Sequence, residues 1–246
     1  MVQIVDAYCT LGTERETALN PADLLRLMDQ AGIDRAIVAP EDREIAVENA
    51  SGNRRVVGLV SECENRLIPA CTANPWYGRQ ACEELHRAVA DGGRLLVLAP
   101  ALQGFLLTDE LADPLLEEAG RLRVPVYVHT GPHSSAAPTQ LVLMAERHPS
   151  ARFILGHCGS TDYHHDMPAV FRAAPKNVWF ELSLVRPWAA VGYAGLTDPS
   201  RLIFGSAAPR NHPAYELRHL SQYLPVADNP LIYGENIIRL LEGTAS

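Results

Sequence analysis

The stretch VPVYVHTG, residues 124–131, is a short run of apolar and β-branched residues that ends in a histidine and a glycine turn. A segment of helical period follows it and stops at Pro149. The next apolar run, RFILGH at residues 152–157, again ends in a histidine. A strand, a helix and a second strand in this order predict two neighbouring parallel strands, with His129 and His157 at their carboxyl ends.

The same alternation runs along the whole chain. Eight candidate strands are VQIVDA (2–7), RAIVAP (35–40), RLIPACT (66–72), RLLVLAP (94–100), VPVYVHT (124–130), RFILGH (152–157), NVWFELS (177–183) and RLIFGS (201–206). Nearly continuous apolar strands between helices predict a parallel sheet buried on both faces. Eight units in 246 residues predict one α/β domain, residues 1–246, folded as a (β/α)8 TIM barrel, which typically takes about 250 residues. An open doubly wound sheet is disfavoured because DAYCTLG, after the first strand, is no glycine-rich phosphate turn.

Helix boundary signals agree with this alternation. Asn20, followed by a proline, is a candidate N-cap, and Gly32 supplies a stop. Asp113, again followed by a proline, repeats the same signal. The segment 229–243 is typical of a closing helix. His148, on a predicted helix, is expected to be exposed to solvent.

Composition narrows the class of partner. Apolar residues make up 47% and charged residues 20%, as in soluble globular proteins, and the net charge of −8 without a basic stripe argues against nucleic-acid binding. No apolar run approaches the roughly 20 residues of a spanning helix, so no membrane partner is expected. An N-terminus without a secretory signal and five scattered cysteines predict a reduced, cytoplasmic protein. A small molecule is therefore the expected partner, and pairing into a homodimer is left open.

Catalytic side chains of a barrel lie at the carboxyl ends of its strands. This rule selects His129 and His157 after the fifth and sixth strands, Tyr8 after the first, and Glu181 near the end of the seventh. The loops at the same mouth supply four candidate substrate-binding residues, Thr10, Trp76, Arg210 and His212. Of these, an arginine after the last strand suits an acidic substrate, because a guanidinium can bind a carboxylate with two hydrogen bonds.

Five pieces of the chain carry a family resemblance. VPVYVHTG, FILGHCGS, NVWFELS and RLIFGSAAP resemble the motifs of the fifth to eighth strands of the amidohydrolase superfamily, and YGENIIRLL resembles its final helix. The resemblance is to the amidohydrolase-2 group, which holds metal-dependent hydrolases and aminocarboxymuconate-semialdehyde-type decarboxylases. It implies the same barrel fold, and it extends over almost the whole chain.

Taken position by position, the resemblance implies a depleted metal site. The histidines of the group's fifth and sixth strands fall on His129 and His157. Its first-strand His-x-His falls on Tyr8 and Thr10, and its eighth-strand aspartate falls on Ala207. A catalytic zinc usually needs three protein ligands and a water, so no cofactor is expected.

Two sources of substitute metal ligands stay open. Glu181 would complete a two-histidine, one-carboxylate set with His129 and His157, and zinc would then remain a candidate cofactor. The loop TDYHHD, residues 161–166, offers further histidines and an aspartate, although a solvated loop is the simpler interpretation.

The groups that remain predict a metal-independent acid–base site. Imidazoles give and take protons near neutrality, and two neighbouring imidazoles resist double protonation, which favours one base and one acid. Tyr8 would donate a hydrogen bond to a developing oxyanion. The sequence thus favours an enzyme of lyase, cyclisation, dehydration or hydrolase type acting on a small organic substrate. Two alternatives are a non-catalytic barrel used for binding or assembly, and a metal-dependent hydrolase or decarboxylase with substitute ligands.

Overall fold

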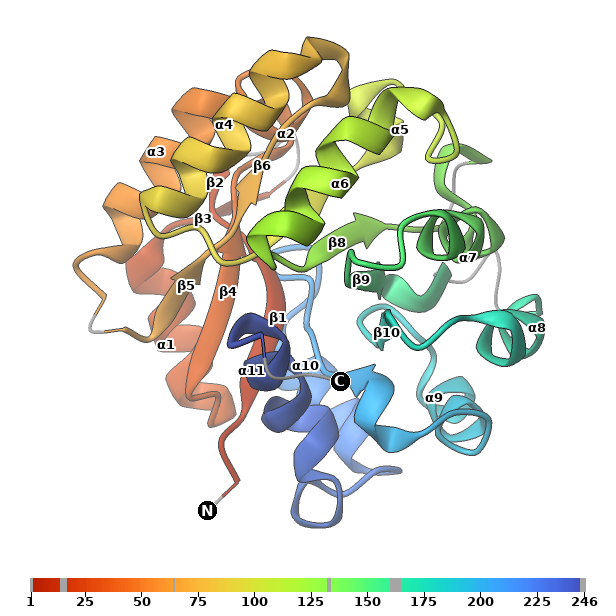
Figure 1. Ribbon diagram of the computed structural model, residues 1–246. Helices are drawn as coiled ribbons and strands as arrows, with labels where there is room; N and C mark the ends of the chain where they lie inside the picture. The colour runs from red at the N-terminus through yellow and green to blue at the C-terminus, as the bar shows by residue number, and fades with distance from the viewer. Residues whose placement is uncertain (1, 14–16, 64, 132–133, 160–164, 244–246) are drawn as a thin grey trace.

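The computed structural model describes residues 2–13, 17–63, 65–131, 134–159 and 165–243. Its parallel strands lie around a central core (Figure 1). In chain order they are β1 Val5–Thr10, β4 Arg35–Ala39, β5 Leu67–Pro69, β6 Cys71–Thr72, β7 Leu96–Leu98, β8 Val126–His129, β9 Phe153–Gly156, β10 Val178–Glu181 and β11 Leu202–Ile203. One sheet has the order β1-β4-β5, and the other has the order β11-β10-β9-β8-β7-β6. A separate antiparallel hairpin joins β2 Gly12–Thr13 to β3 Ala18–Leu19.

Two junctions close these sheets into a barrel. β5 and β6 are the two halves of the predicted third strand, and only Ala70 separates them. Between β11 and β1, the Ala7 N–H donates to the Phe204 carbonyl at 3.1 Å, and the Thr10 N–H donates to the Ala208 carbonyl at 2.8 Å. The predicted (β/α)8 barrel is confirmed, with its third strand interrupted.

Helices surround the strands on the outside (Figure 1). They are α1 Pro21–Ala31, α2 Asp42–Ala46, α3 Asn49–Val60, α4 Arg79–Ala90, α5 Pro100–Gln103, α6 Asp113–Leu122, α7 Pro138–Arg147, α8 Met167–Ala173, α9 Pro187–Ala194, α10 Pro213–Ser221 and α11 Asn236–Leu241. Short 3-10 turns are η1 Pro75–Tyr77, η2 Glu110–Ala112, η3 Ser134–Ala136, η4 His157–Gly159, η5 Pro199–Arg201 and η6 Val226–Asp228, and the π-helical segment η7 Leu231–Glu235 leads directly into α11. In the part of the chain that the structure describes, no helix is both long and apolar enough to cross a bilayer.

The helix boundaries test the capping signals. Asn20 caps α1 by accepting a hydrogen bond from the Asp23 N–H, and Gly32 ends the helix with φ of 72°, as predicted. The N-cap prediction for Asp113 is wrong, because Asp113 is the first residue of α6 and its carboxylate contacts His148 Nε2 at 2.8 Å. His148 is only 5% exposed, so its predicted exposure is also wrong. The carboxylate satisfies a ring nitrogen that water would otherwise have to reach.

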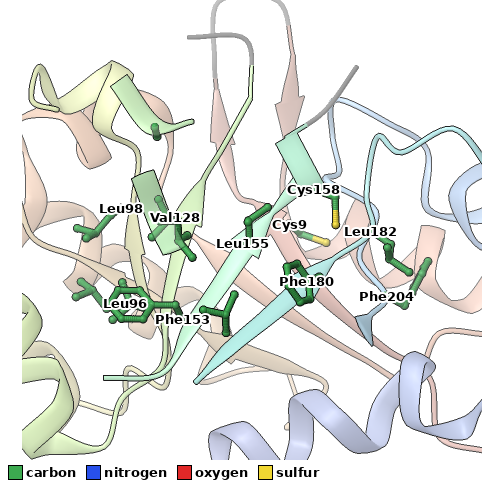
Figure 2. Close-up of a cluster of buried hydrophobic side chains, with 14 of the residues drawn as sticks. Cys9, Leu96, Leu98, Val128, Phe153, Leu155, Cys158, Phe180, Leu182 and Phe204 are labelled. Atoms are coloured by element: carbon green, nitrogen blue, oxygen red, sulfur yellow. The ribbon is translucent and has the colours of Figure 1, made fainter. Parts of the chain in front are cut away.

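Two apolar layers lie on the two faces of the strands. Figure 2 shows part of the outer layer, in which Leu96, Val128, Phe153 and Phe180 belong to the cluster that also contains the buried faces of the surrounding helices. The inner layer fills the barrel with Val5, Ala7, Tyr8, Ile37, Ala39, Ile45, Ile68, Ala70, Leu95, Val97, Ala99, Tyr127, Ile154, Trp179, Ile203, Ala207, Ile237 and Leu240. Since the last two of these belong to α11, the predicted closing helix plugs one end of the barrel.

An irregularity in β1 decides where Tyr8 points. The pairing register of β1 and β4 shifts between Asp6 and Cys9. Ala7 and Tyr8 both belong to the inner layer, whereas successive residues of a regular strand point to opposite faces. The buried Asp6 carboxylate accepts hydrogen bonds from the backbone N–H groups of Tyr8 at 3.3 Å and Ser206 at 2.8 Å. Asp6 therefore ties the bulge to the loop after β11.

Candidate active site

The ends of β1, β8 and β9 bring three predicted catalytic residues into direct contact. The Tyr8 hydroxyl lies 2.7 Å from His129 Nε2. On the other side of the same ring, His129 Nδ1 lies 3.0 Å from His157 Nε2. His157 Nδ1 in turn lies 2.7 Å from the Ser183 hydroxyl. Tyr8, His129, His157 and Ser183 thus form one continuous hydrogen-bonded chain.

The fourth predicted catalytic residue, Glu181, lies at the inner end of this chain. Its fully buried carboxylate accepts hydrogen bonds from the Ser183 hydroxyl at 2.9 Å and the Tyr127 hydroxyl at 2.7 Å. It also accepts from the backbone N–H groups of Ser183 at 2.6 Å and His157 at 3.0 Å. A buried carboxylate needs such donors in place of water. Glu181 therefore supports His157 from behind.

One glycine at the end of β9 and another in the loop after β11 make room for these buried groups. The Tyr127 ring stacks on the Tyr8 ring with centroids 4.6 Å apart. A Cβ atom at Gly156 would lie 2.5 Å from the Tyr127 ring, and one at Gly205 would overlap the Glu181 carboxylate. The two glycines are therefore part of the construction of the site.

The backbone at the strand ends adopts unusual conformations. His157 and Cys158 have φ of 62° and 42°, Leu184 has 62° and Ala207 has 58°. Such left-handed conformations cost non-glycine residues about 1–3 kcal/mol each and are concentrated at functional sites. At the end of β9, the turn points the His157 N–H at Glu181.

Burial favours the uncharged form of both histidines, because it lowers the pKa of each ring. It holds the pKa of His129 well below its usual value, and the charges of His157 and Arg210 lower this pKa further. Burial also lowers the pKa of His157, against the opposing effect of Glu181. Two neutral imidazoles at neutral pH each offer one proton donor and one proton acceptor.

A cavity of about 290 Å³ opens beside the two histidines. It is lined by Ala99, Ala101, Leu102, His129, Thr130, Gly131, Ala136, His157, Leu184 and Arg210. Its walls are thus mostly apolar, and its polar groups are the imidazoles, a hydroxyl and one guanidinium. Arg210 is half exposed and also pairs with Asp42 at 3.1 Å. This combination suits a small molecule that carries an anionic group.

The other predicted substrate-binding residues lie outside the cavity lining. Thr10 is buried, and its hydroxyl donates to the Tyr8 hydroxyl at 3.4 Å. Trp76 is 61% exposed, and its indole N–H donates to the Gly104 carbonyl at 3.1 Å. His212 caps α10, because its Nδ1 accepts a hydrogen bond from the Ala214 N–H at 3.2 Å. Of the four candidates, only Arg210 reaches the cavity.

Comparison with known proteins agrees with the fold and the motifs. The family profile described as Amidohydrolase matches residues 13–242. The chain belongs to this amidohydrolase family. The resemblance predicted from the strand motifs is therefore confirmed. No curated protein matches the chain.

Solved structures share the barrel of this chain at low sequence identity. The 5-carboxyvanillate decarboxylase from Sphingomonas paucimobilis superposes with a TM-score of 0.77 at 16% identity, over 98% of this chain and 99% of that chain. A TIM-barrel protein from Bordetella bronchiseptica gives 0.78 at 15% identity, over 99% and 100%. A dihydroxybenzoic acid decarboxylase from Polaromonas, with bound manganese and an inhibitor, gives 0.77 at 16% identity, over 98% and 97%. These structures share the fold of this chain.

The manganese of the Polaromonas enzyme gives no support to the expectation of a metal-free site. In this chain, His129 Nδ1 and His157 Nε2 face each other at 3.0 Å, near the roughly 3.4 Å that separates two nitrogens on one tetrahedral zinc. Glu181, however, approaches His157 from the opposite ring nitrogen, at 3.6 Å from Nδ1. Over the described ranges, no three His, Cys, Asp or Glu residues form a metal-binding group. The described donors therefore do not fit a metal that needs three protein ligands; residues 160–164 of the predicted alternative loop lie outside the described residues.

Two functional neighbours, Tyr127 and Ser183, were not predicted from the sequence. Tyr127 precedes His129 by two residues, and Ser183 follows Glu181 by two. Side chains two apart on a strand share a face, so strand periodicity was a signal for Tyr127 on β8, whereas Ser183 lies two residues beyond the end of β10.

A second cavity of about 400 Å³ adjoins the first, because Leu184 lines both. Its wall includes Glu216, which is 9% exposed and which accepts a hydrogen bond from Asn211. Burial, with a smaller contribution from Glu181, raises the pKa of Glu216 from 4.5 to about 7. A carboxyl whose pKa is higher in the folded state stabilises the fold most in acid, and this contribution is lost as the pH rises from 4.5 to about 7.

Replacing Glu216 with glutamine should therefore make the protein more stable than the wild type at pH 8. We expect the difference in unfolding free energy between the variant and the wild type to grow by about 2–3 kcal/mol between pH 5 and pH 8. Urea unfolding at both pH values measures it. Glu83→Gln, on the half-exposed surface of α4, is the matched control and should show little dependence on pH. A Glu216→Gln effect of equal size at both pH values would contradict the buried-carboxyl interpretation.

Proposed function

We propose that this protein is an enzyme that moves protons to and from a small organic substrate with Tyr8, His129 and His157, without a metal ion. The observation that carries this proposal is the direct contact between His129 Nδ1 and His157 Nε2, 3.0 Å apart beside the cavity. The remaining nitrogens of the pair are taken by the Tyr8 and Ser183 hydroxyls. Positioned acid–base groups of this kind contribute about 10²–10⁴-fold to a rate.

The neutral state of the pair favours base chemistry. A lowered histidine pKa leaves the imidazole uncharged and able to accept a proton at neutral pH. The reaction class that fits is abstraction of a proton from an O–H group, or from a C–H group beside a carbonyl. The electron pair then expels a leaving group or closes a ring. Lyase chemistry, as elimination of water or cyclisation, is therefore the proposed activity.

The cavity limits the substrate that this chemistry would act on. Its apolar walls and its Arg210 guanidinium favour a small, mainly apolar molecule with one carboxylate. The solved structures with this barrel include enzymes named for 5-carboxyvanillate and dihydroxybenzoic acid. Hydroxylated aromatic acids are therefore the first compounds to test, together with aliphatic hydroxy acids that can lose water.

The test is turnover by protein whose metal content is known. Chelator-treated and untreated protein are incubated with these acids, the products are identified by mass spectrometry, and metal is measured in both samples. We expect turnover that chelation leaves unchanged, in protein with less than stoichiometric metal. Turnover that appears only when zinc or manganese is added would overturn the metal-independent mechanism. Saturable binding of these acids without turnover would favour the non-catalytic alternative.

A further inference from the structure

The direction of each hydrogen bond in the chain from Tyr8 to Glu181 follows from its donors and acceptors. The Glu181 carboxylate accepts from the Ser183 hydroxyl, which has only one proton to give. The Ser183 oxygen, 2.7 Å from His157 Nδ1, must then accept a hydrogen bond from that nitrogen. The proton of neutral His157 therefore lies on Nδ1.

The position of this proton also decides the donor and the acceptor in the two remaining contacts. With its proton on Nδ1, His157 has an acceptor at Nε2, and the nitrogen that faces it at 3.0 Å, His129 Nδ1, must donate. His129 Nε2 is then an acceptor as well, and the Tyr8 hydroxyl donates to it at 2.7 Å. In each hydrogen bond from Tyr8 to Ser183, the donor is therefore the group farther from Glu181 and the acceptor is the group nearer to it.

We propose that Ser183, held by Glu181, is a positioning residue that fixes both histidines in the Nδ1–H tautomer and thereby makes Tyr8, His129 and His157 a proton relay. This inference rests on the proposed function, which supplies the substrate proton. It adds the direction of transfer and two supporting residues, Ser183 and Tyr127.

The relay conserves protons and forms only O–H and N–H bonds. When a substrate proton reaches the Tyr8 oxygen, Tyr8 releases its own proton to His129 Nε2. His129 then releases its Nδ1 proton to His157 Nε2. The positive charge ends on His157, whose Nδ1 lies 3.6 Å from the Glu181 carboxylate. The positive charge thus ends beside a buried anion, where Coulomb attraction stabilises it.

Tyr127 supports the anionic end of the relay. Its hydroxyl provides one of the four hydrogen bonds to Glu181, and its ring stacks against Tyr8. Tyr127→Phe keeps the ring and removes one donor. We expect this variant to retain the tautomers, because Ser183 still connects Glu181 to His157.

Nitrogen-15 NMR of histidine-labelled protein tests the relay directly, because the two ring nitrogens report which one carries the proton. His129→Gln and His157→Gln assign the signals. In the wild type we expect both residues with protonated Nδ1 and unprotonated Nε2. Ser183→Ala should abolish this preference at His157, and Ser183→Thr, which keeps the hydroxyl, should restore it. Ser206→Ala removes another buried strand-end hydroxyl, one that accepts from the Ala208 N–H, and should change neither tautomer.

An Nε2–H tautomer at either histidine of the wild type would overturn the inference, whatever becomes of the Ser183→Ala variant. Unchanged tautomers in a folded Ser183→Ala protein would overturn it equally. The readout needs no turnover, so it stands apart from the proposed function. Turnover with the wrong tautomers would refute the relay alone, whereas the expected tautomers without any turnover would refute the enzymatic proposal alone.

Discussion

Replacing His129 with alanine is expected to lower kcat/KM by about 10²–10⁴-fold, the contribution of a positioned acid–base group. His129 is the middle of the hydrogen-bonded chain, with the Tyr8 hydroxyl on one ring nitrogen and His157 on the other. It also lines the cavity, whereas Glu181 and Ser183 are fully buried behind it. Its loss therefore breaks the hydrogen-bonded chain between Tyr8 and His157.

The measurement is steady-state kinetics with the substrate found in the turnover test, with thermal unfolding of each variant alongside. His86→Ala is the matched control, because His86 is an exposed residue of α4 that pairs with Glu118 of α6 and neither lines the cavity nor belongs to the hydrogen-bonded chain. It should leave kcat/KM nearly unchanged. Full activity in a folded His129→Ala protein would remove the histidine pair from the mechanism.

A second large effect is expected from the triple variant Tyr8→His, Thr10→His, Ala207→Asp, which should gain the ability to bind a metal ion. Tyr8 and Ala207 are both in the inner layer, and the Ala207 N–H donates to the Tyr8 carbonyl at 3.1 Å. Thr10 contacts the Tyr8 hydroxyl. The three changes add two imidazoles and a carboxylate beside His129 and His157, which exceeds the three protein ligands of a catalytic zinc. We expect one zinc per chain after dialysis, where the wild type keeps less.

Metal analysis and thermal unfolding with and without zinc measure this gain. A ligand at about 1,000 times its dissociation constant stabilises the folded state by about 4 kcal/mol, so the triple variant should unfold at a clearly higher temperature with zinc. Adding His129→Ala to the triple variant removes one of the two histidines already present and should weaken zinc binding. If the triple variant holds no more zinc than the wild type, the three positions do not surround the histidine pair.

Local patterns in the sequence accounted for the barrel. The apolar strands, the N-cap at Asn20 and the left-handed stop at Gly32 all depend on residues close together in the chain. Asp113 shows the limit of such reasoning, since a partner 35 residues away, His148, takes the carboxylate that the local signal assigned to a helix cap.

Strand order likewise placed Tyr8, His129, His157 and Glu181 at one end of the barrel. It did not show that Glu181 lies behind His157 rather than beside both histidines, nor that His212 caps a helix outside the cavity. These outcomes depend on side-chain directions after the strands end, where periodicity no longer applies.

The sequence by itself determined the succession of strands and helices, the family and the two strand-end histidines, because periodicity, capping and motif order are written in neighbouring residues. Only the tertiary structure decided that the His129 ring lies between Tyr8 and His157 and that Ser183 joins His157 to Glu181. The physical reason is that hydrogen bonds between different strands require a precise mutual placement of their ends. Closure of the barrel and packing of its buried layers set that placement.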